Sequence, residues 1–276
     1  MKNKFGFIAV TLVLLVASCS PSQDKANLPE PLSRDALKFS VTQKSGEDNV
    51  VYLQSQTNGV IPYWDFGSGT SIQVNDTVIF PFSGDYVIHY DASTGGGFVE
   101  GDSVTVHVTT TNLSYLTDPS WAYLTGGQNG KTWVLDMARP IGWYGYDYLK
   151  NNGSADDWSW HPDYAGNEWV MPDRYYGEMT FDLNNGKNYH RTYIDDQGTT
   201  ENCSGKFDFN IASHTIKLIG CELLYGGDYH GQVTNWSNVT VLALSDTSMT
   251  LAVSRDHPNP GDGPCWIGFT YKVKTK

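Results

Sequence analysis

Basic residues are scarce in this sequence. Its 276 residues include 18 lysines and arginines but 30 aspartates and glutamates, which gives a formal net charge of −12. A chain with this excess of acid repels phosphate groups at long range and attracts none. The composition therefore predicts that the protein has no nucleic-acid partner.

Helical patterning is also missing. No window of eleven or more residues repeats its apolar side chains with a period near 3.6. Short runs that alternate apolar and polar residues occur instead, separated by Asn-Gly and Gly-Gly pairs. This combination predicts an all-β protein.

The sequence lacks several motifs that carry chemistry. It has seven histidines but no His-Glu-x-x-His, no Cys-x-x-Cys and no Gly-x-Ser-x-Gly, so we expect neither a transition-metal site nor a serine nucleophile elbow. Oxygen ligands for a structural Ca²⁺ are offered by Asp156, Asp157 and the loop 256–262, but their spacing is not that of an EF-hand. A solvated acidic loop is the default expectation, and no cofactor is predicted.

Cysteines are few and unevenly placed. Besides Cys19 there are Cys203, Cys221 and Cys265, and an odd count leaves at least one free thiol. A bridge between Cys203 and Cys221 requires adjacent strands. Both also suit the role of small buried hydrophobes, and we favour that interpretation without a bridge.

The N-terminus has the pattern of an export signal. Lys2 and Lys4 precede an apolar run over residues 5–16, which is too short to span a membrane. The run ends in Val-Ala-Ser-Cys19, which resembles the lipobox of bacterial lipoproteins. The resemblance implies a signal peptide over residues 1–18 and lipid attachment at Cys19; an ordinary secretory signal is the alternative. Residues 19–35 are polar and contain prolines, so we expect a flexible tether.

Residues 36–112 are predicted to form a first β domain. In the run 103–108 three valines share one face, as in a strand of a β-sandwich. The segments 63–69 (Tyr-Trp-Asp-Phe-Gly-Ser-Gly) and 83–90 resemble the PKD family of immunoglobulin-like modules, although Ser68 replaces the usual second aspartate of the turn. The resemblance implies a spacer sandwich with Trp64 in its core; Trp64 as a binding residue is the alternative.

Residues 117–276 are predicted to form a larger antiparallel β domain. Alternating runs joined by short turns, such as Asn184-Asn185-Gly186, favour a second sandwich of the jelly-roll type or a closed lipocalin-like barrel. We expect Trp133 and Trp266 to lie in its core, because both fall within strand patterns.

Between residues 136 and 178 lies a long segment rich in tryptophan and tyrosine with no clear strand, and loops of this length are usually functional. Flat indole rings mixed with acids and amides suit the apolar faces and hydroxyl edges of sugars. Two further loops span residues 226–236 and 255–264, and we expect Trp169 to be half buried. The predicted ligand-binding residues are Trp143, Tyr144, Tyr146, Asp157, Trp158, Trp160, His161 and Asp163.

Catalysis is not predicted. Common glycosidases need two carboxylates about 5–10 Å apart, and no short motif pairs Glu168, Glu178 or Glu222. The Glu-x-Asp-x-x-Glu strand of laminarinase-like jelly-roll glycosidases is also absent. A jelly-roll glycoside hydrolase remains the enzymatic alternative.

The order of lipobox, tether, PKD-like spacer and tryptophan-rich β domain resembles the surface glycan-binding lipoproteins of Bacteroidetes polysaccharide-utilisation systems. The resemblance implies non-catalytic binding of a polysaccharide, such as a β-glucan. It also implies a lipid anchor at the outer membrane, exposure to the cell exterior, and a TonB-dependent transporter complex as partner. A structural or adhesive surface protein is a further alternative.

Overall fold

The computed structural model describes residues 28–150 and 158–275, and most of these residues that have regular structure lie in β-strands. The all-β prediction is confirmed. The leader, the anchor Cys19, and Asp156 with Asp157 lie outside the described residues. Within the described ranges, no helix is long and apolar enough to cross a membrane.

The described chain divides into two compact units. The first contains residues 28–42, 52–78 and 86–106, and the second contains 43–51, 79–85 and 107–275. The predicted domain limits, 36–112 and 117–276, assign the two short segments to the first domain instead. Those limits stay a prediction.

Two small sheets account for the N-terminal strands. The first has the order β1 (Phe39–Lys44), β2 (Glu47–Ser55), β5 (Asn75–Ile79). The second has the order β4 (Thr70–Ser71), β3 (Ile61–Asp65), β6 (Gly84–Thr94), β7 (Gly97–Val108). Their inward residues alternate with exposed ones, as expected for strands with one face in a core.

Trp64 anchors the contact between these sheets. It is fully buried on β3, its ring centroid lies 4.5 Å from that of Tyr90 and 5.8 Å from that of Phe39, and its indole Nε1 donates a 2.9 Å hydrogen bond to the carbonyl of Gln73. Phe39 lies on the first sheet and Tyr90 on the second. The prediction that Trp64 is a core residue is confirmed.

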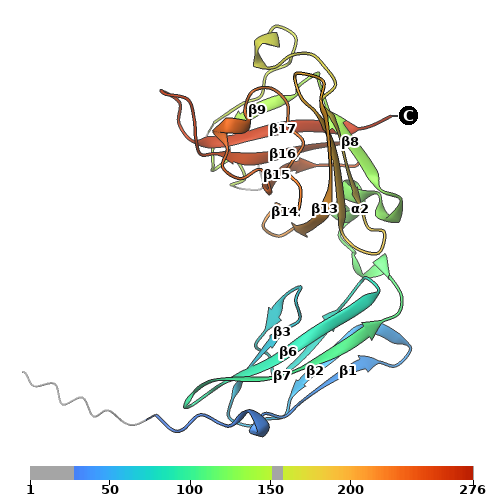
Figure 1. The fold of residues 1–276 in the computed structure, drawn as a ribbon, viewed down its shortest axis with the longest axis vertical. Helices are drawn as coiled ribbons and strands as arrows, with labels where there is room; N and C mark the ends of the chain where they lie inside the picture. Colours follow the sequence, from blue (N-terminus) through green and yellow to red (C-terminus); the bar gives the residue numbers. More distant parts are fainter. Residues whose placement is uncertain (1–27, 151–157, 276) are drawn as a thin grey trace, which may run out of the picture. The chain divides into compact units, whose positions relative to one another are not determined.

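The C-terminal strands form a closed barrel of eight strands (Figure 1). In order around the barrel they are β8 (Lys131–Leu135), β11 (Gly177–Asp182), β12 (Asn188–Ile194), β13 (Thr200–Asn210), β14 (Thr215–Ile219), β15 (Asn238–Leu244), β16 (Ser248–Arg255) and β17 (Cys265–Val273). All pairings are antiparallel, and β17 closes the circle by pairing with β8 through Tyr271 and Leu135. Of the two architectures that the sequence left open, the structure has the barrel.

Large apolar side chains fill the barrel. Trp133, Phe181, Phe207 and Tyr271 are fully buried, and Trp133 donates its indole N–H to the carbonyl of Leu124. The core position predicted for Trp133 is confirmed. The core position predicted for Trp266 is wrong, because it is only partly buried, whereas its neighbour Ile267 is fully buried. Alternation along β17 directs Ile267 inward and Trp266 outward.

Helical segments in the described part of the chain are short. They are η1 (Arg34–Ala36), η2 (Leu113–Tyr115), α2 (Pro119–Thr125), η3 (Gly127–Asn129), η4 (Glu168–Val170) and η5 (His230–Gln232). The start of α2 follows from Asp118, whose carboxylate accepts a 2.8 Å bond from the Ser120 amide, and from Pro119 in the first turn. Gly126, with φ of 61°, ends it in the left-handed conformation.

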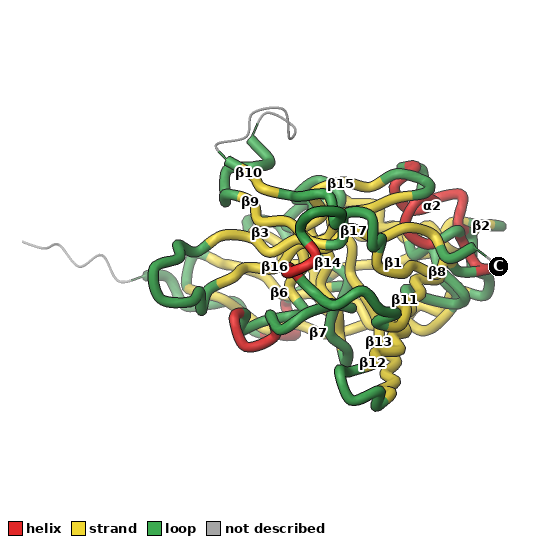
Figure 2. The backbone as a smooth tube through the Cα atoms, turned by 90° about the horizontal axis from the view of Figure 1, so that it is seen from above, coloured by secondary structure: helices red, strands yellow, loops and turns green. Residues whose placement is uncertain are grey.

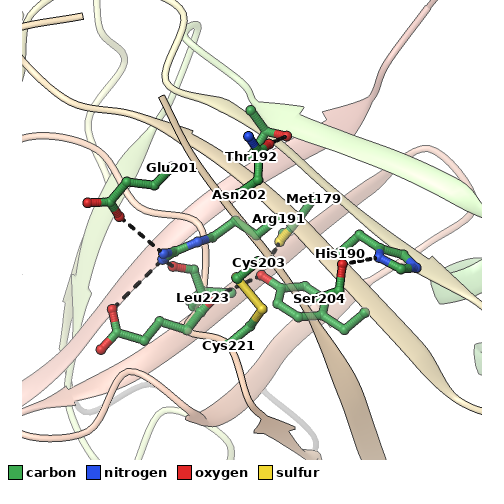
Figure 3. Close-up of a disulfide and its surroundings, with 12 residues drawn as sticks. Met179, His190, Arg191, Thr192, Glu201, Asn202, Cys203, Ser204, Cys221 and Leu223 are labelled. Carbon is green, nitrogen blue, oxygen red and sulfur yellow. Dashed lines mark hydrogen bonds and ion pairs between the residues drawn. A yellow bond between two sulfur atoms is a disulfide. The ribbon is translucent and has the colours of Figure 1, made fainter. Parts of the chain in front are cut away.

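A disulfide joins Cys203 to Cys221 (Figure 3). The expectation of two unbridged cysteines is therefore wrong. The register of β13 and β14 pairs Lys206 with Ile219 and so brings the two cysteines together, with a Cα separation of 5.9 Å that suits a disulfide. Cys265 is the free thiol that the odd count requires, and it is buried.

Candidate functional site

A short hairpin lies beside the first half of β17. It consists of β9 (Ile141–Tyr144) and β10 (Ser159–Trp160), which lie side by side in Figure 2. The second half of β17 pairs with β8, and the first half pairs with β9 instead. The hairpin therefore continues the barrel sheet beyond its closed part.

The register decides which side chains share a face of this hairpin. Trp143 is directly opposite Trp160 on β10 and Ile267 on β17, and directly opposite residues of adjacent strands lie on one face. Since Ile267 is part of the barrel core, Trp143 and Trp160 continue the core-facing row. Tyr144 is opposite Ser159 and Trp266, and these three occupy the other face.

Three tryptophans stack in a row. The ring centroids of Trp143 and Trp160 are 5.1 Å apart with 26° between their planes, and those of Trp160 and Trp169 are 5.6 Å apart with 17°. Trp143 is partly buried against the core, whereas Trp160 is 41% and Trp169 71% exposed. The row thus runs from the core into solvent, and we call it the tryptophan stack.

Trp169 is held in the stack by the backbone that follows it. Next to it, Val170 and Met171 are buried in the barrel core. The Val170 carbonyl accepts a 2.6 Å hydrogen bond from Tyr229 and the Met171 carbonyl one of 2.9 Å from Tyr164. The exposed indole is therefore carried by a fixed backbone. The half-buried position expected for Trp169 is wrong.

A pocket of about 540 Å³ adjoins the stack. Its lining residues are Trp143, Trp158, Trp160, Trp169, Tyr229, Gln232, Arg255, Asn259 and Asp262. They come from the aromatic segment and from both additional loops that the sequence indicated, 226–236 and 255–264. Those loops are tied together, because the Asp256 carboxylate accepts a 2.8 Å bond from the Thr234 amide and His257 N–H donates to the Gln232 carbonyl.

The polar side of the pocket contains one ion pair. Arg255 is buried, lies 3.3 Å from the Asp262 carboxylate and donates a 2.8 Å bond to the Gly263 carbonyl. Among the described residues, Arg255 Nε and Gln232 Oε1 have no hydrogen-bond partner. Burial raises the pKa of Tyr229 to about 12, so its hydroxyl is neutral at physiological pH and donates to Val170.

The indole N–H groups differ between core and pocket. The fully buried Trp64, Trp133 and Trp236 each donate to a backbone carbonyl. Within the described part of the chain, no such bond is made by the four pocket tryptophans. Their donors are available to hydroxyl groups of a ligand.

The structure groups only some of the predicted ligand-binding residues. Trp143, Trp158 and Trp160 line the pocket together, and Asp157 lies outside the described residues. Asp163 is bound by Arg139, 2.5 Å from Nη2 and 3.0 Å from Nε, and does not line the pocket.

The remaining three predicted residues lie elsewhere. Tyr144 is buried on the opposite face of the hairpin, where its ring stacks with that of His161 at 5.8 Å. The hydroxyl groups of Tyr146 and Ser254 form a hydrogen bond of 2.7 Å. The Tyr146 ring contacts that of Trp266 edge-on, with 5.7 Å between the ring centroids. These three residues do not line the pocket. Tyr144 points away from it because successive residues of a strand face opposite sides. A role in ligand binding for the three stays a prediction.

The acidic residues considered for catalysis each interact with different partners, and none is part of a metal-binding cluster in the described ranges. No three His, Cys, Asp or Glu side chains lie close enough to hold a metal ion in the described ranges. Glu168 accepts from the Gly166 amide, a bond that lowers its pKa, and Glu178 pairs with Lys274 and Tyr175. Glu222 pairs with His230 at 3.3 Å.

In comparisons with known proteins, no protein-family model and no curated protein matched the chain. The geometry of the pocket is therefore the basis for a functional proposal.

Proposed function

We propose that the protein is a non-catalytic carbohydrate-binding protein and that the pocket beside the tryptophan stack holds the glycan. The observation that carries this proposal is the row Trp143–Trp160–Trp169, whose outer indole is 71% exposed on a fixed backbone. Singly exposed apolar side chains are common on proteins, but three exposed tryptophans around one pocket, Trp158, Trp160 and Trp169, are typical of a ligand surface.

The exposed aromatic area is adequate for a ligand. A tryptophan side chain presents about 250 Å², and Trp158, Trp160 and Trp169 are 47%, 41% and 71% exposed. Together they offer roughly 400 Å², within the range of functional apolar patches on monomers. The pocket volume of about 540 Å³ suits a ligand the size of a short oligosaccharide segment.

Stacking alone does not give useful affinity. One sugar face covering about 100 Å² contributes roughly 2.5 kcal/mol, and two contribute about 5 kcal/mol. Association costs at least about 4 kcal/mol, and micromolar binding requires about −8 kcal/mol. Hydrogen bonds from the indole N–H groups and from Gln232, Asn259 and Asp262 supply the difference, so we expect binding in the micromolar range.

Binding without hydrolysis is favoured by the acids of the pocket. Asp262 is the one carboxylate among the described lining residues, and it is paired with Arg255. A glycosidase of the common type requires a second carboxylate about 5–10 Å away. Glu168, Glu178 and Glu222 are not among the lining residues.

The cellular part of the proposal rests on the sequence. The lipobox-like Cys19 and the polar tether suit an outer-membrane lipoprotein that faces the cell exterior. In that location the protein would present polysaccharide, with β-glucan as the first candidate, to a TonB-dependent transporter complex.

The test is a glycan panel. The full chain, purified in mild detergent, is run on native gels that contain one polysaccharide each, with β-glucans, α-glucans, xylans and mannans represented. We expect retardation in at least one gel, no new reducing ends after long incubation, and loss of retardation for Trp158→Ala and Trp160→Ala. Unchanged mobility across the whole panel would refute carbohydrate binding, and release of reducing ends would replace it with hydrolysis.

A further inference from the structure

The pocket has one positive side chain, and that charge is already matched. Arg255 is the one cationic residue among the described lining residues. Its guanidinium lies 3.3 Å from Asp262 and also donates to a backbone carbonyl. A ligand carboxylate or sulfate therefore meets no unpaired cation there.

The surroundings of the pocket add negative charge. Asp228 directly precedes the lining residue Tyr229 in the sequence, and Glu168 directly precedes the lining residue Trp169. The chain as a whole has a net charge of −12. Anionic polymers are repelled at long range by such a field, and in the pocket they gain no compensating ion pair.

We propose that the pocket selects uncharged glycans over uronate-containing or sulfated ones and that the Arg255–Asp262 ion pair sets this selectivity. The inference rests on the proposed carbohydrate binding and names the substrate class of the same site. Uncharged hydroxyl groups can donate to Asp262 and Asn259 and accept from the indole N–H groups without breaking the pair.

The experiment compares matched ligands. An oligosaccharide of the glycan that binds best in the panel is titrated calorimetrically into the full chain. The same oligosaccharide is titrated after its primary hydroxyls have been oxidised to carboxylates, so that only charge and its immediate geometry differ. We expect binding of the oxidised form to be at least tenfold weaker, which corresponds to about 1.4 kcal/mol.

Two variants test the role of the ion pair. Asp262→Asn removes the carboxylate that neutralises Arg255. The Asp262 side chain is half exposed, so the fold should tolerate the change. Asn259→Lys adds a cation at an exposed position of the same pocket and keeps the pair intact. We expect both to bind the oxidised ligand at least tenfold more tightly than the natural protein does, with an affinity that falls as salt rises.

Asp246→Asn is the matched control. It changes the net charge by the same amount, but Asp246 pairs with Lys131 and does not line the pocket. The Asp246→Asn variant should prefer the neutral ligand over the oxidised one to the same degree as the natural protein. Equal or tighter binding of the oxidised ligand by the natural protein overturns the inference and leaves carbohydrate binding intact. Failure of every glycan to bind overturns both.

Discussion

Replacing Trp169 by alanine is the most direct test of the tryptophan stack. Its indole is the outermost of the three and is 71% exposed, so its removal takes away ligand surface and little of the core. The neighbouring Val170 and Met171 stay in place, because both are buried and their carbonyls accept bonds from tyrosines. The backbone of η4 should therefore survive the substitution.

The size of the effect follows from the area lost. If one sugar residue covers about 100 Å² of the Trp169 face, the variant loses roughly 2.5 kcal/mol of binding free energy, which is a 50- to 100-fold weaker affinity. Folding stability should fall by only about 1 kcal/mol, since the lost aromatic contact with Trp160 is of that order. Truncation of the fully buried Trp133 should instead cost about 3–5 kcal/mol.

Calorimetric titration measures the affinity, and urea denaturation of the same samples measures stability. Tyr146→Ala is the control, because Tyr146 is also an exposed aromatic of this segment but contacts Trp266 on the opposite face of the hairpin. We expect its affinity to stay within twofold of the natural value. Equal losses for Trp169→Ala and Tyr146→Ala, or no loss for Trp169→Ala, would refute the assignment of the binding face.

Three further predictions concern stability and reactivity. Replacing Cys203 and Cys221 by serine opens a loop with a sequence separation of 18, so the free energy of unfolding in urea should drop by about 3 kcal/mol; an unchanged value would contradict a formed bridge. Burial raises the pKa of the Cys265 thiol, so a thiol reagent should label it slowly in the native protein and rapidly in urea; fast native labelling would contradict its burial. The hydrogen bond from the Thr234 amide lowers the pKa of Asp256 in the folded protein. Its contribution to stability is therefore complete above the unfolded pKa near 3.9 and is lost as pH falls through the lower folded value, and melting temperatures of Asp256→Asn and the natural protein should converge at low pH.

Local pattern was sufficient for the β class and for the loops that form the pocket. Turn residues and tryptophan density indicated the aromatic segment, and the segments 226–236 and 255–264 were also identified as loops. Local pattern could not predict that these three segments come together around one pocket. Tyr229 and Asn259 join the tryptophans because the loops 226–236 and 255–264 are hydrogen-bonded to each other and because β9 pairs with the distant strand β17.

Strand alternation explains two differences between the sequence-based expectation and the structure. Tyr144 follows Trp143 directly, but adjacent residues in a strand face opposite sides, so Tyr144 does not line the pocket. Trp266 carried the same signal, since it precedes the inward Ile267. Trp169 gave no such signal, because η4 has no strand alternation. Its exposure follows from the anchoring of Val170 and Met171 in the barrel core and from the hydrogen bond that Tyr229, 59 residues away in the sequence, donates to Val170.

The division of β17 between two partners explains how the proposed binding surface lies next to a filled barrel. Because β8 occupies only its second half, the first half is free to pair with β9, and the core-facing row continues from Ile267 to Trp143 and Trp160. The same alternation of side chains that fills the core therefore also holds indole rings at fixed positions towards solvent. A surface fixed in this way loses little conformational entropy when a ligand binds, which preserves the modest stacking energy that sugars provide.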